Sequence, residues 1–202
     1  MNIPIVSSDQ KLRAYAMSRV TKETSVELTL NLDGGEVSVS TGIGFFDHML
    51  TALAFYAGFG LELRTKGDLE VDGHHTVEDT GIVLGQAFAA ALEDNRGITR
   101  FGTAFVPMDE ALCRVVLDIS NRPYLVYEVE MPQSMIGGYD ACLTEEFMRA
   151  FSMNSGITLH VNALYGRNAH HITEALFKAL GLALKQAIRV EGDRVVSTKG
   201  VL

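Results

Sequence analysis

The apolar and polar residues in the first half of the chain follow two different periods. In the stretch TSVELTLNL (24–32) apolar residues occupy every second position, which predicts a strand with one buried face. The residues DGG (33–35) favour the positive φ angles of a hairpin turn. The stretch EVSVS (36–40) is therefore expected to return as the partner of the first strand.

The segments after residue 41 are predicted to form a helix, then strands, then a second helix. Apolar residues recur at three- and four-residue intervals in 42–60, and this segment ends at a glycine, as helices commonly do. The stretch LELRTKGDLEVDG (61–73) predicts two more short strands. The stretch 74–95, which is rich in alanine and leucine, predicts a second helix.

The second half of the chain repeats this order of elements. Strands are expected in 110–120 and 122–130, followed by a helix in 143–155. A strand in 156–164 and a long helix in 170–190 complete the series. Two strands, a helix, a strand and a helix are thus predicted in each half, with one additional short strand in the first half.

A repeated dipeptide aligns the two halves. His-His occurs twice at an offset of 96 residues, and the same offset matches GLEL (60–63) with GITL (156–159). With a gap of two residues, His48 falls opposite Glu146. The chain is therefore predicted to be an internal duplication.

The expected architecture is an α+β fold made of two half-repeats. Each half is expected to form a roughly four-stranded sheet with two helices on one face, so that the helices are sandwiched between the two sheets. No Pro- or Ser-rich linker separates the halves. We predict a first half-repeat in 1–95, a second in 96–190 and a tail containing STKG in 191–202.

Composition narrows the class of protein. The chain has 202 residues, of which 47% are hydrophobic, enough for one well-packed domain or two closely packed halves. Its formal net charge of −8 argues against nucleic acid or an anionic membrane surface as a partner. Two cysteines without CxxC spacing, and no long apolar run, predict a cytoplasmic protein without disulfides or membrane spans.

The His-His pairs belong to two HHxxE motifs at the starts of predicted helices. Residues four apart share a helix face, so His74 with Glu78, and His170 with Glu174, can each grip one divalent cation. The second histidine of each pair points about 100° away and can reach a second ion. Imidazole and carboxylate donors without thiolate suit Mn²⁺, Fe²⁺ or Zn²⁺.

A structural role for these residues is the simpler alternative. A single HHxxE motif is weak evidence for a metal site, because polar residues often begin helices. Two copies at matching positions of the repeat favour metal binding. His48 alone reads as a core histidine, but its repeat partner Glu146 is also a possible ligand. His160, in a strand pattern, is interpreted as structural.

Basic and hydroxyl residues outside the motifs suggest a pocket for an anion. Taken singly, each is better explained as a solvated surface residue. The candidates are Arg100, Arg122, Lys178, Ser197, Thr198 and Lys199.

Several longer motifs carry a family resemblance. GIGFFDHML, DGHHTVEDTGIVLGQA, ISNRPYL, GITLHV, LYGRNAHHITEALFKALGLALKQA and STKGVL resemble the corresponding segments of monofunctional imidazoleglycerol-phosphate dehydratases, from about residue 12 to the C-terminus. The resemblance implies a dehydratase that converts imidazole glycerol phosphate into imidazole acetol phosphate in histidine biosynthesis. It also implies two Mn²⁺ ions per active site that bind the substrate imidazole as imidazolate, in a homo-oligomer of 24 subunits with active sites between subunits.

The resemblance also implies roles for individual residues. Glu23 matches a substrate-contacting carboxylate and is the preferred proton carrier, with Glu174 as the alternative and Asp109 as a weaker candidate. Several relatives have histidine where this chain has Glu146, a carboxylate that still suits Mn²⁺. The implied metal ligands are His48, His74, His75, Glu78, Glu146, His170, His171 and Glu174. The implied catalytic residues are Glu23, Glu174, His75 and His171, and the implied phosphate contacts are Arg100, Arg122, Lys178, Ser197, Thr198 and Lys199.

Two other functions use the same ligands. A pair of ions can activate water, as in a dinuclear hydrolase of a small phosphate ester. The ions can also be structural, in an assembly or storage shell. The bare motifs do not separate these functions from dehydration.

Overall fold

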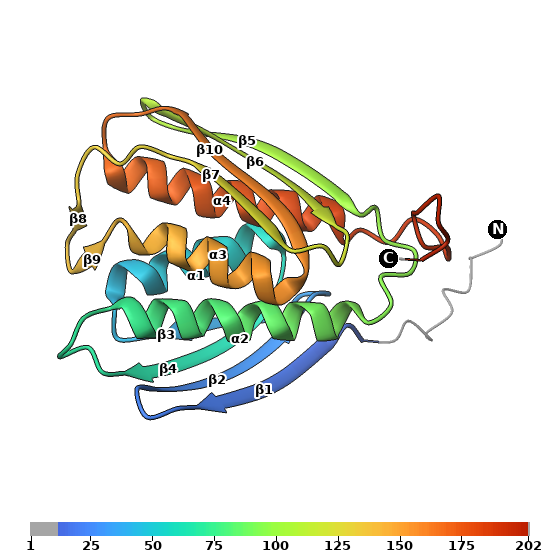
Figure 1. Cartoon of the computed structure of the whole chain (residues 1–202), viewed down its shortest axis with the longest axis horizontal. Helices are drawn as coiled ribbons and strands as arrows, with labels where there is room; N and C mark the ends of the chain where they lie inside the picture. Colours follow the sequence, from blue (N-terminus) through green and yellow to red (C-terminus); the bar gives the residue numbers. More distant parts are fainter. Residues whose placement is uncertain (1–11, 202) are drawn as a thin grey trace, which may run out of the picture.

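Within residues 12–201, the part of the chain that the computed structural model describes, two four-stranded sheets enclose four helices (Figure 1). The first half contains β1 (Ala14–Val20), β2 (Thr24–Asn31), β3 (Val37–Ser40), α1 (Gly44–Ala57), β4 (Gly60–Gly67) and α2 (His74–Leu92). The second half contains β5 (Phe101–Met108), β6 (Ala111–Ile119), β7 (Tyr124–Glu128), β8 (Met135–Ile136), β9 (Tyr139–Asp140), α3 (Leu143–Ser155), β10 (Ile157–Tyr165) and α4 (Ala169–Ala187).

The two halves have the same topology. The strand order is β1-β2-β4-β3 in the first sheet and β5-β6-β10-β7 in the second, and each sheet ends in one parallel pair. Helices α1 and α2 cover the inner face of the first sheet, and α3 and α4 cover that of the second. The predicted α+β fold, with duplicated halves and a helical layer between two sheets, is confirmed. The residue boundaries of the half-repeats stay a prediction.

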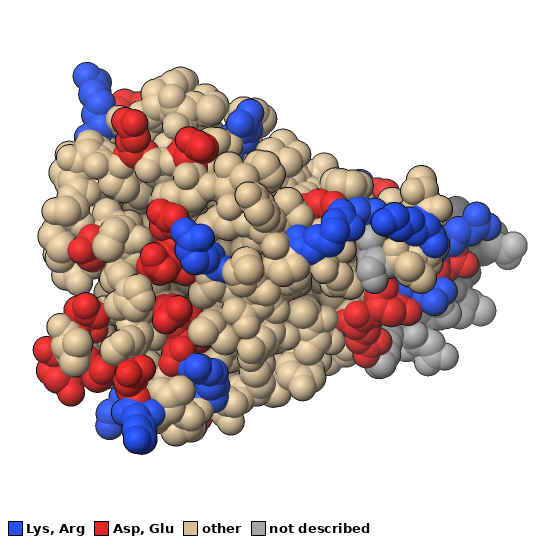
Figure 2. Space-filling model, viewed as in Figure 1, with Lys and Arg blue, Asp and Glu red and all other residues tan. Residues whose placement is uncertain are grey.

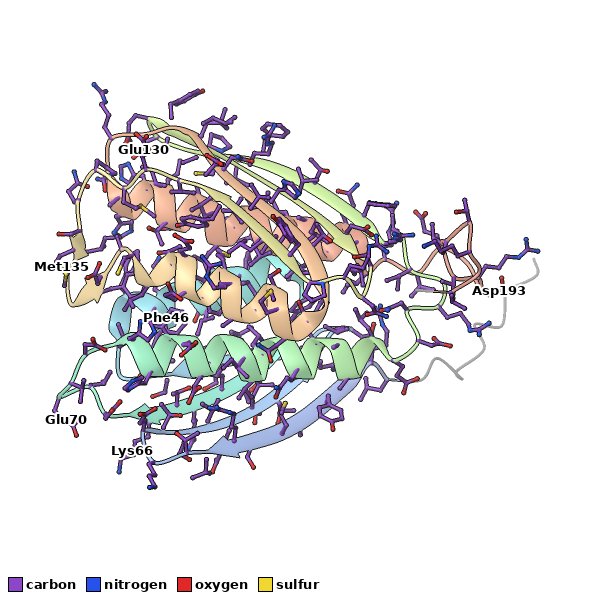
Figure 3. All side chains as sticks on the ribbon, in the orientation of Figure 1. Phe46, Lys66, Glu70, Glu130, Met135 and Asp193 are labelled. Atoms are coloured by element: carbon purple, nitrogen blue, oxygen red, sulfur yellow. The ribbon has the colours of Figure 1, made fainter. Side chains whose placement is uncertain are left out.

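The helices pair across the halves. α1 packs against α4, and α2 packs against α3, so each pair takes one helix from each repeat. Figure 3 shows Phe46 of α1 in the middle of this layer. Its ring centroid lies 5.5 Å from that of Phe147 in α3, and Phe147 lies 5.1 Å from Phe177 in α4. The two halves therefore share one core. None of the helices in the described part of the chain combines the length and apolar character needed to cross a membrane.

The predicted hairpin between 24–32 and 36–40 is wrong. β4 lies between β2 and β3, and β3 pairs in parallel with β4. Gly34 and Gly35 have φ angles of 112° and 141°, and they turn the chain past the end of β4 rather than back along β2. A Cβ on Gly60 would lie 2.7 Å from the carbonyl oxygen of Gly34, so this crossing requires glycine.

Only one of the two strands predicted in 61–73 exists. β4 ends at Gly67, and the following residues form turns, with a hydrogen bond from Val71 N to Asp68 O of 2.8 Å. The apolar residues that suggested the second strand, Leu69 and Val71, are exposed. The sequence pattern also missed β1 and β5. Both are edge strands, and small or polar residues interrupt their alternation.

An ion pair joins the edge of the first sheet to the end of α4. Arg13 Nε and Nη2 donate to Asp33 Oδ1 at 3.0 and 2.5 Å, and Arg13 Nη1 donates to Ile188 O at 2.7 Å. Partial burial by itself raises the pKa of Asp33, but the hydrogen bonds from Arg13 outweigh it and bring the pKa below the ordinary value of 3.8.

We expect Asp33→Asn to lower stability at neutral pH and to have no effect in acid. A carboxyl whose folded pKa is depressed stabilises the fold above its ordinary pKa, and this contribution is lost as the pH falls through the folded value. Thermal unfolding of both proteins from about pH 7 to about pH 2.5 measures the difference. The exposed Asp193 provides a control, Asp193→Asn, with the same change of charge. A difference between wild type and Asp33→Asn that stays constant over this range would contradict the expectation.

Candidate metal centre

The two motif helices begin at the same end of the molecule and in the same way (Figure 1). Asp72 Oδ1 accepts a hydrogen bond of 2.7 Å from the backbone N–H of His74. Asn168 Oδ1 accepts one of 2.9 Å from the backbone N–H of His170. Asp72 and Asn168 are separated by the offset of 96 residues that relates the repeats. Each HHxxE motif is thus fixed by an equivalent side chain just before its helix.

Three predicted ligands converge where α1 meets α4. Glu174 Oε2 lies 3.1 Å from His170 Nε2 and 3.4 Å from His48 Nε2. Among the described residues, these form the one group of three or more His, Cys, Asp or Glu side chains whose ligand atoms all lie within 4.8 Å of one another. Ligand bonds to a first-row cation are about 2.1 Å long, so its opposite ligands lie about 4.2 Å apart. The cluster has the size and the donors to hold one divalent cation.

Glu174 is the central side chain of this cluster. It is buried, and Lys178 Nζ donates to its Oε1 at 2.7 Å, one helical turn further along α4. Burial by itself raises the pKa of Glu174, but hydrogen bonds from Lys178, His170 and His48 bring that pKa below its ordinary value. The carboxylate is therefore ionised at neutral pH, as metal binding requires.

The motif on α2 is more open. His74 Nε2 lies 3.9 Å from Glu78 Oε2, and both side chains are more than 40% exposed. Glu146 is half-buried in the first turn of α3, but it does not join these two residues in a cluster of the same compactness. His74 also lines a cavity of about 490 Å³ whose walls include Phe45 and Cys142. The structure thus brings together one of the two expected ligand groups within a single chain.

The second histidine of each motif is held by a carboxylate. His75 Nδ1 lies 3.1 Å from both carboxylate oxygens of Asp68, and His171 Nδ1 lies 2.6 Å from Glu110 Oε2. These contacts raise the pKa of each histidine. Since a carboxylate only accepts hydrogen bonds, the ring proton lies on Nδ1 and Nε2 is left as the ligand atom. Glu23 Oε2, from the β1–β2 turn, lies 3.9 Å from His75 Nε2.

Sequence reasoning missed Asp68 and Glu110. Asp109, the weaker candidate for the proton carrier, has its Oδ2 3.6 Å from His171 Nε2. Asp109 occupies a turn, with a φ of 46°. Glu110 also accepts from the backbone N–H groups of 167 and 168, and its contacts, first of all with His171, lower its pKa to about 2. The sequence feature that could have identified them is their position, because Asp68 and Glu110 each come shortly after the end of a strand.

A basic pocket lies at the other end of the molecule. Its volume is about 910 Å³. Arg100 Nε and Nη2 donate to the Asp118 carboxylate at 2.6 and 3.0 Å, and Arg122 Nη2 donates to it at 3.3 Å. Asp118 thus pairs with both arginines, and because Lys199 also lines the pocket, the pocket keeps a positive charge. The predicted phosphate contacts that line it are Arg100, Arg122, Ser197, Thr198 and Lys199.

The basic pocket and the metal cluster of one chain are far apart. The backbone N–H of Arg100 bonds to Ala187 O at the end of α4, whereas His170 is in its first turn. At 1.5 Å per residue, the length of helix between them is about 25 Å. In Figure 2 basic side chains gather around the right-hand end, near the place where Figure 3 labels Asp193, while many acidic ones lie at the left. Lys178 is the exception among the predicted phosphate contacts, because it lies beside the metal cluster.

Comparison with known proteins gives the family. A family model described as imidazoleglycerol-phosphate dehydratase matches residues 41–184. The chain belongs to this family. It is 57% identical over 194 residues to the imidazoleglycerol-phosphate dehydratase of Gluconobacter oxydans, which covers 94% of this chain and 98% of the relative. It is 54% identical over 193 residues to that of Acetivibrio thermocellus, which covers 94% and 99%.

The fold agrees with a solved imidazoleglycerol-phosphate dehydratase. The crystal structure of the enzyme from Staphylococcus aureus superposes with a TM-score of 0.82 at 38% identity, covering 88% of this chain and 99% of that one. The resemblance seen in the motifs is thereby confirmed, and the chain is an enzyme, a dehydratase. The roles assigned to individual residues stay predictions.

Proposed function

We propose that this imidazoleglycerol-phosphate dehydratase removes water from imidazole glycerol phosphate to give imidazole acetol phosphate in histidine biosynthesis, with two Mn²⁺ ions per active site. The observation that carries the proposal is the convergence of His48, His170 and Glu174 in a chain of this family. The two unpaired cysteines, Cys113 and Cys142, support a further proposal that the enzyme works in the reducing cytoplasm.

Eight side chains supply donors for the two cations. The carboxylates on Nδ1 of His75 and His171 support this assignment, because they leave Nε2 of each ring as the ligand atom. When bound, the cations would supply Lewis acidity to the substrate imidazole, which would favour its imidazolate form. The proposed ligands are His48, His74, His75, Glu78, Glu146, His170, His171 and Glu174.

The remaining side chains move a proton and hold the phosphate. Glu23 is the proposed proton carrier, supported by its position beside His75 and by its 55% exposed side chain, which leaves it accessible to substrate. Glu174 is the alternative carrier, although its buried contacts favour a fixed role. Arg100, Arg122, Lys178, Ser197, Thr198 and Lys199 are the proposed phosphate contacts, which supply remote binding energy that orients the reacting carbon.

We further propose that complete active sites form between subunits of a homo-oligomer, with 24 subunits as the expected size. The separation of about 25 Å along α4 supports this, because a small phosphorylated imidazole is much shorter than that. Large apolar side chains such as Phe55, Phe101 and Tyr124, each more than half exposed, also support burial against other copies.

Incubation of the Mn²⁺-loaded protein with the phosphorylated imidazole diol tests the proposed function. We expect the ketone of imidazole acetol phosphate to accumulate, and its carbonyl gives a direct readout. Release of inorganic phosphate without ketone would instead identify a dinuclear hydrolase. If the protein binds metal to saturation but an imidazole-containing ligand has no effect on that metal, the metal is structural and the protein is a structural shell.

A further inference from the structure

The turn that carries Glu23 is tied to α2 by a buried aspartate. Asp79 is only 6% exposed, and Thr24 Oγ1 donates a hydrogen bond to its Oδ2. Arg19 Nη1, on the other side of the same turn, lies 2.5 Å from that oxygen. One carboxylate therefore anchors both strands that flank the β1–β2 turn.

The helix places Asp79 on the same face as His75. The two residues are four apart, and such residues lie one above the other on a helix. Asp79 holds Thr24, and His75 Nε2 lies 3.9 Å from the carboxylate of Glu23, the preceding residue. The distance between Glu23 and His75 is therefore set by a contact one helical turn away.

The turn itself is closed by its own hydrogen bonds. Thr21 Oγ1 accepts from the backbone N–H groups of Glu23 and Thr24 at 3.1 and 2.9 Å, and Thr21 N donates to Thr24 O at 2.8 Å. A second tie runs to the end of β4, where Asp68 N donates to Glu23 O at 3.1 Å. These hydrogen bonds link the backbone of Glu23 to that of Thr24, so a shift of Thr24 is expected to shift Glu23.

The end of β4 is in close contact with both β2 and α2. Gly67 pairs with Thr24 across the sheet. A Cβ on Gly67 would lie 2.1 Å from Thr76 Oγ1, so the first turn of α2 rests directly on the strand. The second repeat has no equivalent anchor, because the residue 96 positions after Asp79 is Ala175. The anchor therefore belongs to the one repeat that carries Glu23.

We propose that Asp79, acting through Thr24, is a positioning residue that holds Glu23 beside His75 for proton transfer. This inference rests on the role of Glu23 in the proposed function. Removing the anchor leaves the carboxylate and the metal ligands in place but lets the turn shift. A displacement of about 1 Å at a reacting group costs up to about 100-fold in rate.

The test replaces Thr24 by Val, which keeps the shape of the side chain and removes the hydroxyl. We expect a 10- to 100-fold lower kcat with KM changed by less than about threefold, and unchanged Mn²⁺ content. Thr24→Ser restores the donor and should recover most of the rate. The control is Thr29→Val, the same change at an exposed position of the same strand, which should leave the rate unchanged.

A double-mutant cycle with Glu23→Gln decides whether Thr24 acts through Glu23. We expect Thr24→Val to have no further effect on kcat in the Glu23→Gln background. If the effects of the two substitutions on kcat multiply, the inference is overturned, while the role of Glu23 is unaffected. Wild-type turnover by Glu23→Gln would remove Glu23 from the mechanism and, with it, the proposed role of the anchor.

Hydrogen exchange gives a readout that does not depend on activity. In Thr24→Val the backbone amides of 23, 24 and 68 should exchange faster, whereas those in the middle of β2 should not change. Unchanged exchange in the turn would overturn the inference whatever the enzyme catalyses. Absence of the ketone product from the wild type would refute the proposed function alone, since the exchange result stands without it.

Discussion

Glu174→Gln is expected to abolish turnover and to lower the bound metal. The substitution keeps the volume of the side chain but removes the negative charge that His48 and His170 share. It also leaves Lys178 without its carboxylate partner at 2.7 Å, so a positive charge faces the cation that the site should hold. Replacing a residue that supports a metal ligand lowers metal affinity or activity by about 10- to 100-fold. Loss of a charged ligand should therefore lower kcat/KM by on the order of 1,000-fold or more.

Metal content and activity are measured on the same purified sample. Elemental analysis after dialysis should give less Mn²⁺ per chain in Glu174→Gln than in wild type, and Glu78→Gln should behave in the same way. Glu62→Gln, at an exposed position of β4, provides the control. Full activity in Glu174→Gln with the metal absent would refute the proposed centre.

Gly181→Ala is expected to weaken both the fold and the metal cluster. A Cβ at this position of α4 would lie 2.6 Å from the backbone carbonyl oxygen of Leu53 in α1, and a backbone atom cannot rotate away. The two helices must therefore separate, at a cost of about 2–3 kcal/mol, which exceeds the gain of about 1 kcal/mol from replacing glycine within a helix. The same movement takes His48 away from His170 and Glu174.

Denaturant unfolding of the metal-free proteins measures the first effect, and titration with Mn²⁺ measures the second. The control is Gly44→Ala in the first turn of α1, where a Cβ meets no atom within 4 Å. It should be neutral or slightly stabilising. Equal stability and equal metal affinity in Gly181→Ala would contradict the close contact between α1 and α4.

The sequence predicted the helices well because their signal is local. The stretches from 42, 74, 143 and 170 have apolar residues at helical spacing, and all four are helices. The repeat of the His-His pair then gave the duplication. Both results depend on patterns within one segment or on comparison of two segments, and neither needs knowledge of which segments touch.

Several of the errors concern contacts between distant segments. EVSVS looks like a hairpin partner for β2, yet β4, which follows a whole helix later, takes that position. Asp68 and Glu110 hold the second histidines, but nothing near either residue indicates that it faces an imidazole. Glu146 matches His48 in the alignment, but among the described residues only His48 joins such a compact ligand group, and it does so with His170 and Glu174 of the other repeat. Equivalent positions in a repeat do not guarantee equivalent surroundings.

The pairing of α1 with α4 and of α2 with α3 bears on how such a chain arose. Since His48 reaches the glutamate of the other repeat, a half-length ancestor could not have assembled this cluster within one molecule. Two identical copies, exchanging helices about a twofold axis, would have supplied both clusters at once. Joining two such copies in one chain would turn a dimer contact into the interior of one polypeptide and would leave each half free to differ, as His48 and Glu146 do.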